Sequence, residues 1–134
     1  MATGVFALFC RGVSHSDGQT NLDGPSSLFH AREGIEASFC FVAEIAFPAA
    51  DNGPHRNETI ISDNLGRTLD LKAVATIHAE VQPGDPYFRY SVFVRFNIIA
   101  DGTIQLFGQT TVDGKPVIRG MTTVVAKPVA KSRP

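Results

Sequence analysis

Apolar and polar residues alternate along most of this chain with a period of two. In residues 69–81 the odd positions are all leucine, alanine, isoleucine or valine, whereas most even positions are polar or charged. Such alternation predicts a strand with one face buried and the other in water. Similar patterns predict about eight strands, the one at 21–30 being the weakest: residues 5–10, 21–30, 39–47, 59–62, 69–81, 88–98, 104–112 and 117–125.

The segments between these strands carry turn signals rather than helical patterns. Residues 27–36 are the best helical candidate, but Gly34 interrupts them and Pro25 stands shortly before, which leaves room for at most a short helix. Asp-Gly, Asn-Gly and Pro-Gly pairs recur at the spacing typical of β-sandwiches. We therefore expect an all-β fold, an antiparallel two-sheet sandwich of immunoglobulin-like or Greek-key type. Residues 1–126 would form its single domain and residues 127–134 a flexible tail.

The inward positions of the predicted strands define the expected core. Ten phenylalanines supply much of it, and the absence of tryptophan excludes the Cys–Trp–Cys core of antibody domains. The expected core residues are Phe9, Phe39, Phe41, Ile45, Leu71, Ile77, Tyr90, Val92, Phe96, Ile98, Leu106 and Val124.

Two glycine-containing turns predict how the last three strands pair. A three-residue Ala-Asp-Gly loop with a left-handed glycine would place Ile98 opposite Ile104 and keep both on the core face. A second three-residue loop, Asp-Gly-Lys, would place Gly108 opposite Gly120. We therefore predict an antiparallel meander of the strands at 88–98, 104–112 and 117–125.

The outward side of that meander would carry an apolar patch. In the predicted register Phe107 lies opposite Met121 and diagonal to Phe93, with Arg95 and Arg119 at the rim. An apolar cluster with a polar rim is typical of an interface. We predict a non-catalytic interaction or structural module that self-associates through this patch, most simply as a two-fold dimer, and that has an unknown protein partner. The alternatives are that a loop or the tail covers these side chains, or that they are scattered and have no role.

Charge and hydropathy narrow the classes of partner. The 134 residues include 12 Lys and Arg against 13 Asp and Glu, a formal net charge of -1, so nothing predicts nucleic-acid binding. No apolar run approaches the roughly 20 residues of a membrane span. The first ten residues also lack the basic start of a secretory signal. We expect a cytoplasmic protein that binds neither nucleic acid nor a membrane.

The two cysteines, Cys10 and Cys40, are 30 positions apart in sequence. A zinc site needs about four ligands, commonly in closely spaced pairs, and that pattern is absent. We expect two reduced, half-buried thiols, as is usual in the cytoplasm. A disulfide between them would require neighbouring strands and a secreted protein.

No set of residues predicts catalysis, a cofactor or a metal. A nucleophile elbow is absent, and the aspartates occur singly in turns rather than converging as calcium ligands do. The alternative function is binding of a small polar, sugar-like ligand by the loops that carry His15, Asp17, His55 and Arg56. A hydrolase built on such loops is the less favoured alternative.

Turn motifs along the chain also resemble those of one protein family. The first strand ends in Cys10, and residues 18–24 read Gly-x-x-Asn-x-x-Gly. Phe-Val-Ala-Glu-Ile at 41–45, an Asp-Asn-Leu-Gly turn at 63–66 and the Asp-Gly hairpin within 102–117 complete the pattern. It resembles a family of small single-domain bacterial β-sandwich proteins of unknown function. The resemblance implies a fold without assigned catalysis, and no active-site residue.

Overall fold

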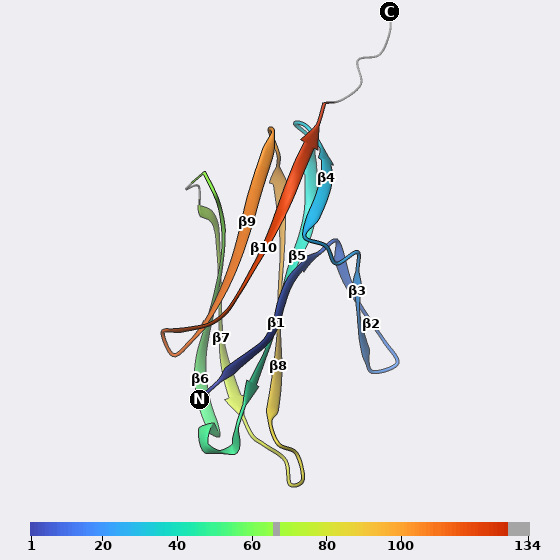
Figure 1. Ribbon diagram of the computed structural model, residues 1–134. Helices are drawn as coiled ribbons and strands as arrows, with labels where there is room; N and C mark the ends of the chain where they lie inside the picture. The colour runs from blue at the N-terminus through green and yellow to red at the C-terminus, as the bar shows by residue number, and fades with distance from the viewer. Residues whose placement is uncertain (66–67, 129–134) are drawn as a thin grey trace, which may run out of the picture.

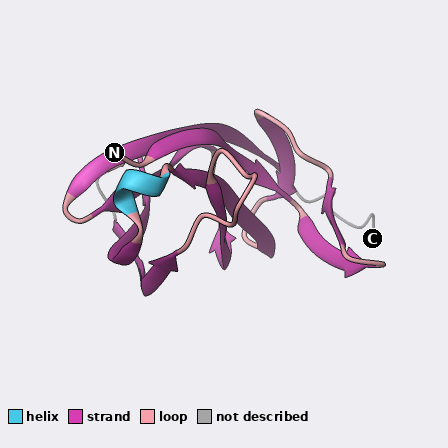
Figure 2. Cartoon of the chain, turned by 90° about the horizontal axis from the view of Figure 1, so that it is seen from below, coloured by secondary structure: helices cyan, strands magenta, loops and turns pink. Residues whose placement is uncertain are grey.

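The computed structural model describes residues 1–65 and 68–128 (Figure 1). Within them the chain is all-β, with ten strands and a single helical turn, η1 (Ala49–Asp51), which lies near the N-terminus in Figure 2. The strands are β1 (Thr3–Cys10), β2 (Gly12–Ser16), β3 (Gln19–Asp23), β4 (Leu28–Arg32), β5 (Glu36–Phe47), β6 (Gly53–Asp63), β7 (Thr68–Ala79), β8 (Phe88–Ile99), β9 (Thr103–Val112) and β10 (Lys115–Lys127).

The strands form three sheets rather than the expected two, because β2 and β3 pair only with each other. The other eight strands belong to two sheets whose inward residues share one apolar core. The smaller sheet has the order β1-β5-β8 and the larger one the order β4-β10-β9-β6-β7. Neighbouring strands are antiparallel, except that β4 runs parallel to β10. Phe9, Phe41 and Phe47 of the smaller sheet and Ile61 and Leu106 of the larger one are fully buried in the shared core.

The alternation of apolar residues predicted most of this core correctly. Ten of the twelve expected core residues are buried, and the other two, Leu71 and Tyr90, are partly buried against the same cluster. The strand count differs because residues 12–32 form β2, β3 and β4 where one weak strand was expected. These strands have only five residues each, too few to establish a clear period.

The predicted three-stranded meander is wrong at its first hairpin. Strand β8 pairs with β5 in the smaller sheet, whereas β9 pairs with β6 and β10 in the larger one. The chain therefore crosses between sheets at the buried Ala100 and at Gly102, which has a φ of 86°. Both arrangements keep Ile98 and Ile104 in the core, so the apolar pattern could not distinguish a crossing from a hairpin.

The second hairpin has the predicted register but a different turn. Gly108 lies opposite Gly120, as expected. The turn has two residues rather than three, because Asp113 and Gly114 both have positive φ (52° and 80°). An irregularity around Val117 supplies the extra residue that restores the register.

A close approach between the sheets explains why glycine occupies position 108. A Cβ atom at this position would lie 2.3 Å from a ring carbon of Phe41. One at Gly120, the neighbour of Gly108 across β9 and β10, would lie 3.1 Å from the same ring. The Phe41 side chain from β5 therefore occupies space that the two glycines leave free.

The expected tail is described only in part. Lys127 is the last residue of β10 and pairs with Arg32 of β4, so this strand extends one residue beyond the predicted domain end. Residues 129–134 of the tail lie outside the described residues, as do residues 66–67 at the end of the Asp-Asn-Leu-Gly motif.

Candidate functional site

The five residues predicted to form one interface lie on two different sheets. Phe93 and Arg95 belong to β8, whereas Phe107 belongs to β9 and Arg119 and Met121 to β10. The outer sides of two facing sheets point in opposite directions, so the predicted contacts of Phe93 and Arg95 with Phe107 are wrong. Phe107 does lie opposite Met121, and the Arg119 guanidinium lies 4.8 Å from the centre of the Phe107 ring.

The β2–β3 hairpin covers part of the outer side of the smaller sheet. Its Val13 and Leu22 pack against a second apolar cluster formed by Cys10, Cys40 and Val42. At the hairpin, the His15 ring lies edge-on to Phe93 at 5.7 Å, and Arg95 donates a 3.2 Å hydrogen bond to the Val13 carbonyl. Phe93 and Arg95 thus already have intramolecular partners, which agrees with the alternative that a loop covers part of the patch.

An apolar stripe crosses the outer side of the larger sheet. It consists of Leu28 on β4, Met121 on β10, Phe107 on β9, Ile60 on β6 and Val74 on β7. Each is opposite or diagonal to the next in the strand registers. Phe107 is half-buried, and the other four are between 38% and 54% exposed. The stripe therefore extends over all five strands of this sheet.

Charged side chains border this stripe. Glu58, beside Ile60 on β6, accepts hydrogen bonds from Arg56 at 2.8 and 3.1 Å and lies 3.4 Å from the Lys72 ammonium. The Arg56 hydrogen bond is the main reason why the pKa of Glu58 lies below its usual value. Together with Arg119 over Phe107, these charges give the stripe the polar rim that interfaces commonly show.

The four residues expected to bind a polar ligand do not gather in one place. His15 and Asp17 lie on the β2–β3 hairpin, where the His15 ring pairs with the Thr20 hydroxyl at 3.1 Å. His55 and Arg56 lie on β6 in the larger sheet. No contact found in the described chain joins the two pairs, so the predicted four-residue site is not formed.

His55 is held by two oxygen acceptors. Its Nδ1 donates to the Asp113 carboxylate at 2.6 Å and its Nε2 donates to the Asp51 carbonyl at 2.5 Å, while Phe47 packs against the ring. A carboxylate and a carbonyl can only accept, so both hydrogen bonds form together when both ring nitrogens are protonated, and this arrangement favours the imidazolium form. The Asp113 hydrogen bond is the main reason why the pKa of His55 is raised, and the same bond lowers the pKa of Asp113. An imidazolium has no lone pair for a metal or for general-base catalysis.

This ion pair predicts a pH dependence of stability. The raised His55 pKa means that its contribution is complete below the unfolded value of about 6.5 and is lost as the pH rises through the folded pKa. The lowered Asp113 pKa means that its contribution is complete above about pH 4 and is lost as the pH falls through the folded pKa. Replacing His55 with glutamine should therefore lower the melting temperature more at pH 5.5 than at pH 8.5.

The matched control for this measurement is the exposed His78. A His78→Gln variant should have the same melting temperature as the wild type at both pH values, because this side chain lies on the outer face of β7. Equal losses for His55→Gln at pH 5.5 and pH 8.5 would contradict the imidazolium assignment.

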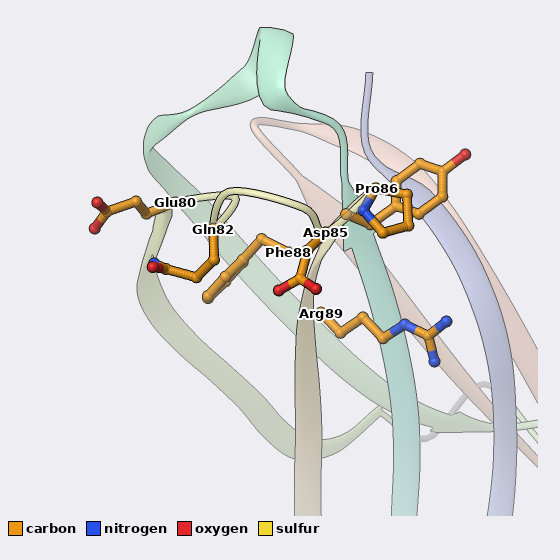
Figure 3. A pocket seen from close by; sticks show the side chains of 7 residues that line it. Glu80, Gln82, Asp85, Pro86, Phe88 and Arg89 are labelled. Atoms are coloured by element: carbon orange, nitrogen blue, oxygen red, sulfur yellow. The ribbon is translucent and has the colours of Figure 1, made fainter.

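A shallow hollow lies at the connection between β7 and β8. It has a volume of about 430 Å³ and is lined by residues 80, 82 and 85–89. In Figure 3 the side chains of Gln82, Asp85 and Phe88 lie beside one another, while Glu80 and Arg89 extend to opposite sides. The half-exposed Tyr87 also belongs to this lining. Polar groups beside an aromatic ring are what a small polar ligand would need, but here they do not converge on a common point.

One residue of the stripe could have been noticed in the sequence. Val74 is the apolar exception on the polar side of the alternation at 69–81. Ile60 on β6 is its diagonal neighbour, and Phe107 on β9 follows beyond Ile60. The three residues come from distant segments, so only the strand order places them in one stripe.

Neither a metal centre nor a membrane-spanning helix is found in residues 1–65 and 68–128. No three His, Cys, Asp or Glu side chains gather there as metal ligands would. No helix in that part has the length and apolar character needed to cross a bilayer. Comparisons of the chain with family models, with curated proteins and with solved structures found no match.

Proposed function

We propose that this protein is a non-catalytic immunoglobulin-like β-sandwich that self-associates through the outer face of its larger sheet. The apolar stripe is the observation that carries this proposal. The partner is a second copy of the chain, related by a two-fold axis.

The strand order supports an immunoglobulin-like sandwich. In such domains strands A, B and E share one sheet, and strands G, F, C and C′ share the other. Strands β1, β5 and β8 correspond to A, B and E. Strands β10, β9, β6 and β7 correspond to G, F, C and C′. Phe41 on β5, seated against Gly108 on β9, joins the two strands that a disulfide links in antibody domains.

The symmetry of the apolar stripe supports a two-fold contact. Phe107 lies on β9, the central strand of the sheet, with two stripe residues on either side. Consider a two-fold axis that lies in the plane of the interface, passes over Phe107 and is perpendicular to the stripe. It would bring Met121 of one copy to Ile60 of the other, and Leu28 to Val74. An isologous interface requires a patch that is self-complementary in this way.

The size of the face also suits a stable dimer. Five strands about 4.8 Å apart and on average about 33 Å long give a face of about 800 Å². Standard interfaces bury about 800 Å² of each partner. The outer face of the smaller sheet offers less free area, because the β2–β3 hairpin already packs on it.

Replacing Phe107 with glutamate should abolish this self-association. The wild type at tens of micromolar is expected to show twice the mass of one chain in light scattering, and Phe107→Glu the mass of one chain. A carboxylate in the centre of the interface would be desolvated without a partner in both copies. Met121→Glu should have the same effect with less risk to folding, because Met121 is 54% exposed.

The matched control is Ile99→Glu. Ile99 is 63% exposed and lies on β8, in the other sheet, so this variant should keep the wild-type mass. A monomeric wild type at tens of micromolar, or a Met121→Glu variant that keeps the doubled mass, would show that the proposed interface is wrong.

A further inference from the structure

Cys10 and Cys40 lie directly opposite each other on two neighbouring strands. Cys10 ends β1, Cys40 lies on β5, and the antiparallel register pairs the two residues. Opposite residues in an antiparallel pair have Cα atoms about 4.5 or 5.5 Å apart. Both distances fall within the range of roughly 4.4–6.8 Å that a disulfide spans.

The two side chains also project to the same side of the smaller sheet. The Cys10 sulfur lies 3.3 Å from the Gly12 carbonyl oxygen and 3.6 Å from the Cys40 carbonyl oxygen, and its one proton can be donated to either. The two thiols interact with each other as well, and both belong to the apolar cluster beneath the hairpin. The paired register and the shared side of the sheet thus place the two side chains suitably for a sulfur–sulfur bond.

The β2–β3 hairpin restricts access to this pair. Cys10 is 0% and Cys40 1% exposed, and Val13 and Leu22 of the hairpin pack over them. Burial raises the pKa of both thiols, that of Cys40 to about 11, so few thiolates form while the hairpin is closed. A two-stranded hairpin is marginally stable on its own, so it can open locally without unfolding the domain.

We propose that Cys10 and Cys40 are a redox pair, which a low-molecular-weight disulfide oxidises to an intramolecular Cys10–Cys40 disulfide when the β2–β3 hairpin opens. One cysteine thiolate attacks the external disulfide, which forms a mixed disulfide and releases one thiolate. The other cysteine thiolate attacks the cysteine sulfur of the mixed disulfide, which forms the Cys10–Cys40 bond and releases the second external thiolate. Two cysteine thiols are oxidised, one external disulfide is reduced to two thiols, and the protons of the cysteines pass to these two products.

The bond would join the edge strand β1 covalently to the central strand β5 of the smaller sheet. It closes a loop of about 30 residues, which restricts the unfolded chain. Oxidation is therefore expected to raise the melting temperature by about 10 °C.

The test is to incubate the folded wild type with oxidised glutathione and follow its mass, its free thiols and its melting temperature. The expected product is a chain that is not cross-linked to another chain, has two fewer free thiols, is about 2 Da lighter and melts at a higher temperature. A Cys40→Ala variant should instead stop at a glutathione adduct of Cys10 or not react. Retention of both thiols, accumulation of adducts on the wild type, or an unchanged melting temperature after bond formation would overturn the proposal.

A variant of the hairpin tests the role of access. Val13→Ser removes apolar contact over the thiols and should raise the rate of oxidation several-fold, because the hairpin opens more often. An exposed strand change elsewhere, Thr76→Ser, should leave the rate unchanged. Equal rates for Val13→Ser and the wild type would refute the proposed control by the hairpin.

Discussion

Replacing Gly108 with alanine should destabilise the fold by about 2–3 kcal/mol, although the change adds a single methyl group. The new Cβ would lie 2.3, 2.4 and 2.7 Å from three carbons of the Phe41 ring. Phe41 is fully buried between the sheets, so its ring can withdraw only by displacing other core side chains. Urea unfolding should show the loss as a lower midpoint with an unchanged slope.

The matched control is Gly12→Ala, where the added methyl group has free space. A Cβ at Gly12 would meet no heavy atom within 4 Å, so Gly12→Ala should change the stability by less than about 0.5 kcal/mol. Introducing Phe41→Leu into the Gly108→Ala variant should recover part of the loss, because the two residues are in contact. If Gly108→Ala and Gly12→Ala unfold at the same urea concentration, the described seating of Phe41 is incorrect.

Replacing Thr59 with valine should cost about 1–3 kcal/mol of stability, even though valine has nearly the same shape. Thr59 on β6 and Thr110 on β9 are opposite, both are fully buried, and their hydroxyl oxygens lie 2.9 Å apart. The valine would leave the Thr110 hydroxyl without this partner in an apolar environment. The loss should be measured as the free energy of unfolding in urea.

The double variant separates lost hydrogen bonding from lost packing. Thr59→Val with Thr110→Val removes both hydroxyls, so the protein should be close to wild-type stability or above it. Thr76→Val, on the exposed face of β7, serves as the surface control and should be nearly neutral. A double variant as unstable as the sum of the single ones would argue against a hydroxyl pair.

The buried threonines illustrate a limit of the sequence pattern. Thr59 and Thr110 occupy inward positions of β6 and β9, but as isolated polar residues they do not mark a core. Their mutual hydrogen bond depends on the pairing of two strands whose residues are about 50 positions apart. Only that pairing makes the two hydroxyls compatible with complete burial.

The turns show what can be derived locally. The Asp113-Gly114 turn and the opposition of Gly108 and Gly120 follow from a short stretch of chain, and the register was predicted correctly. The link through Gly102 looks similar in sequence, but it joins two sheets instead of two neighbouring strands. A short loop with a glycine can form a hairpin or connect two sheets. Which of the two it does here depends on β5, the partner of β8, and on β6, a partner of β9.

The sequence by itself determined which residues face the core, whereas only the tertiary structure decided which outward residues are neighbours. Alternation is a local property, and because both sheets share one core it identifies the inward residues whichever sheet a strand joins. Neighbours on an outer face depend on strand order, which arises from contacts between distant segments. This is why Phe107 and Met121 were placed together correctly and Phe93 was not. It is also why the pairing of Cys10 with Cys40, and the diagonal placement of Phe107 and Ile60, appear only in the folded chain.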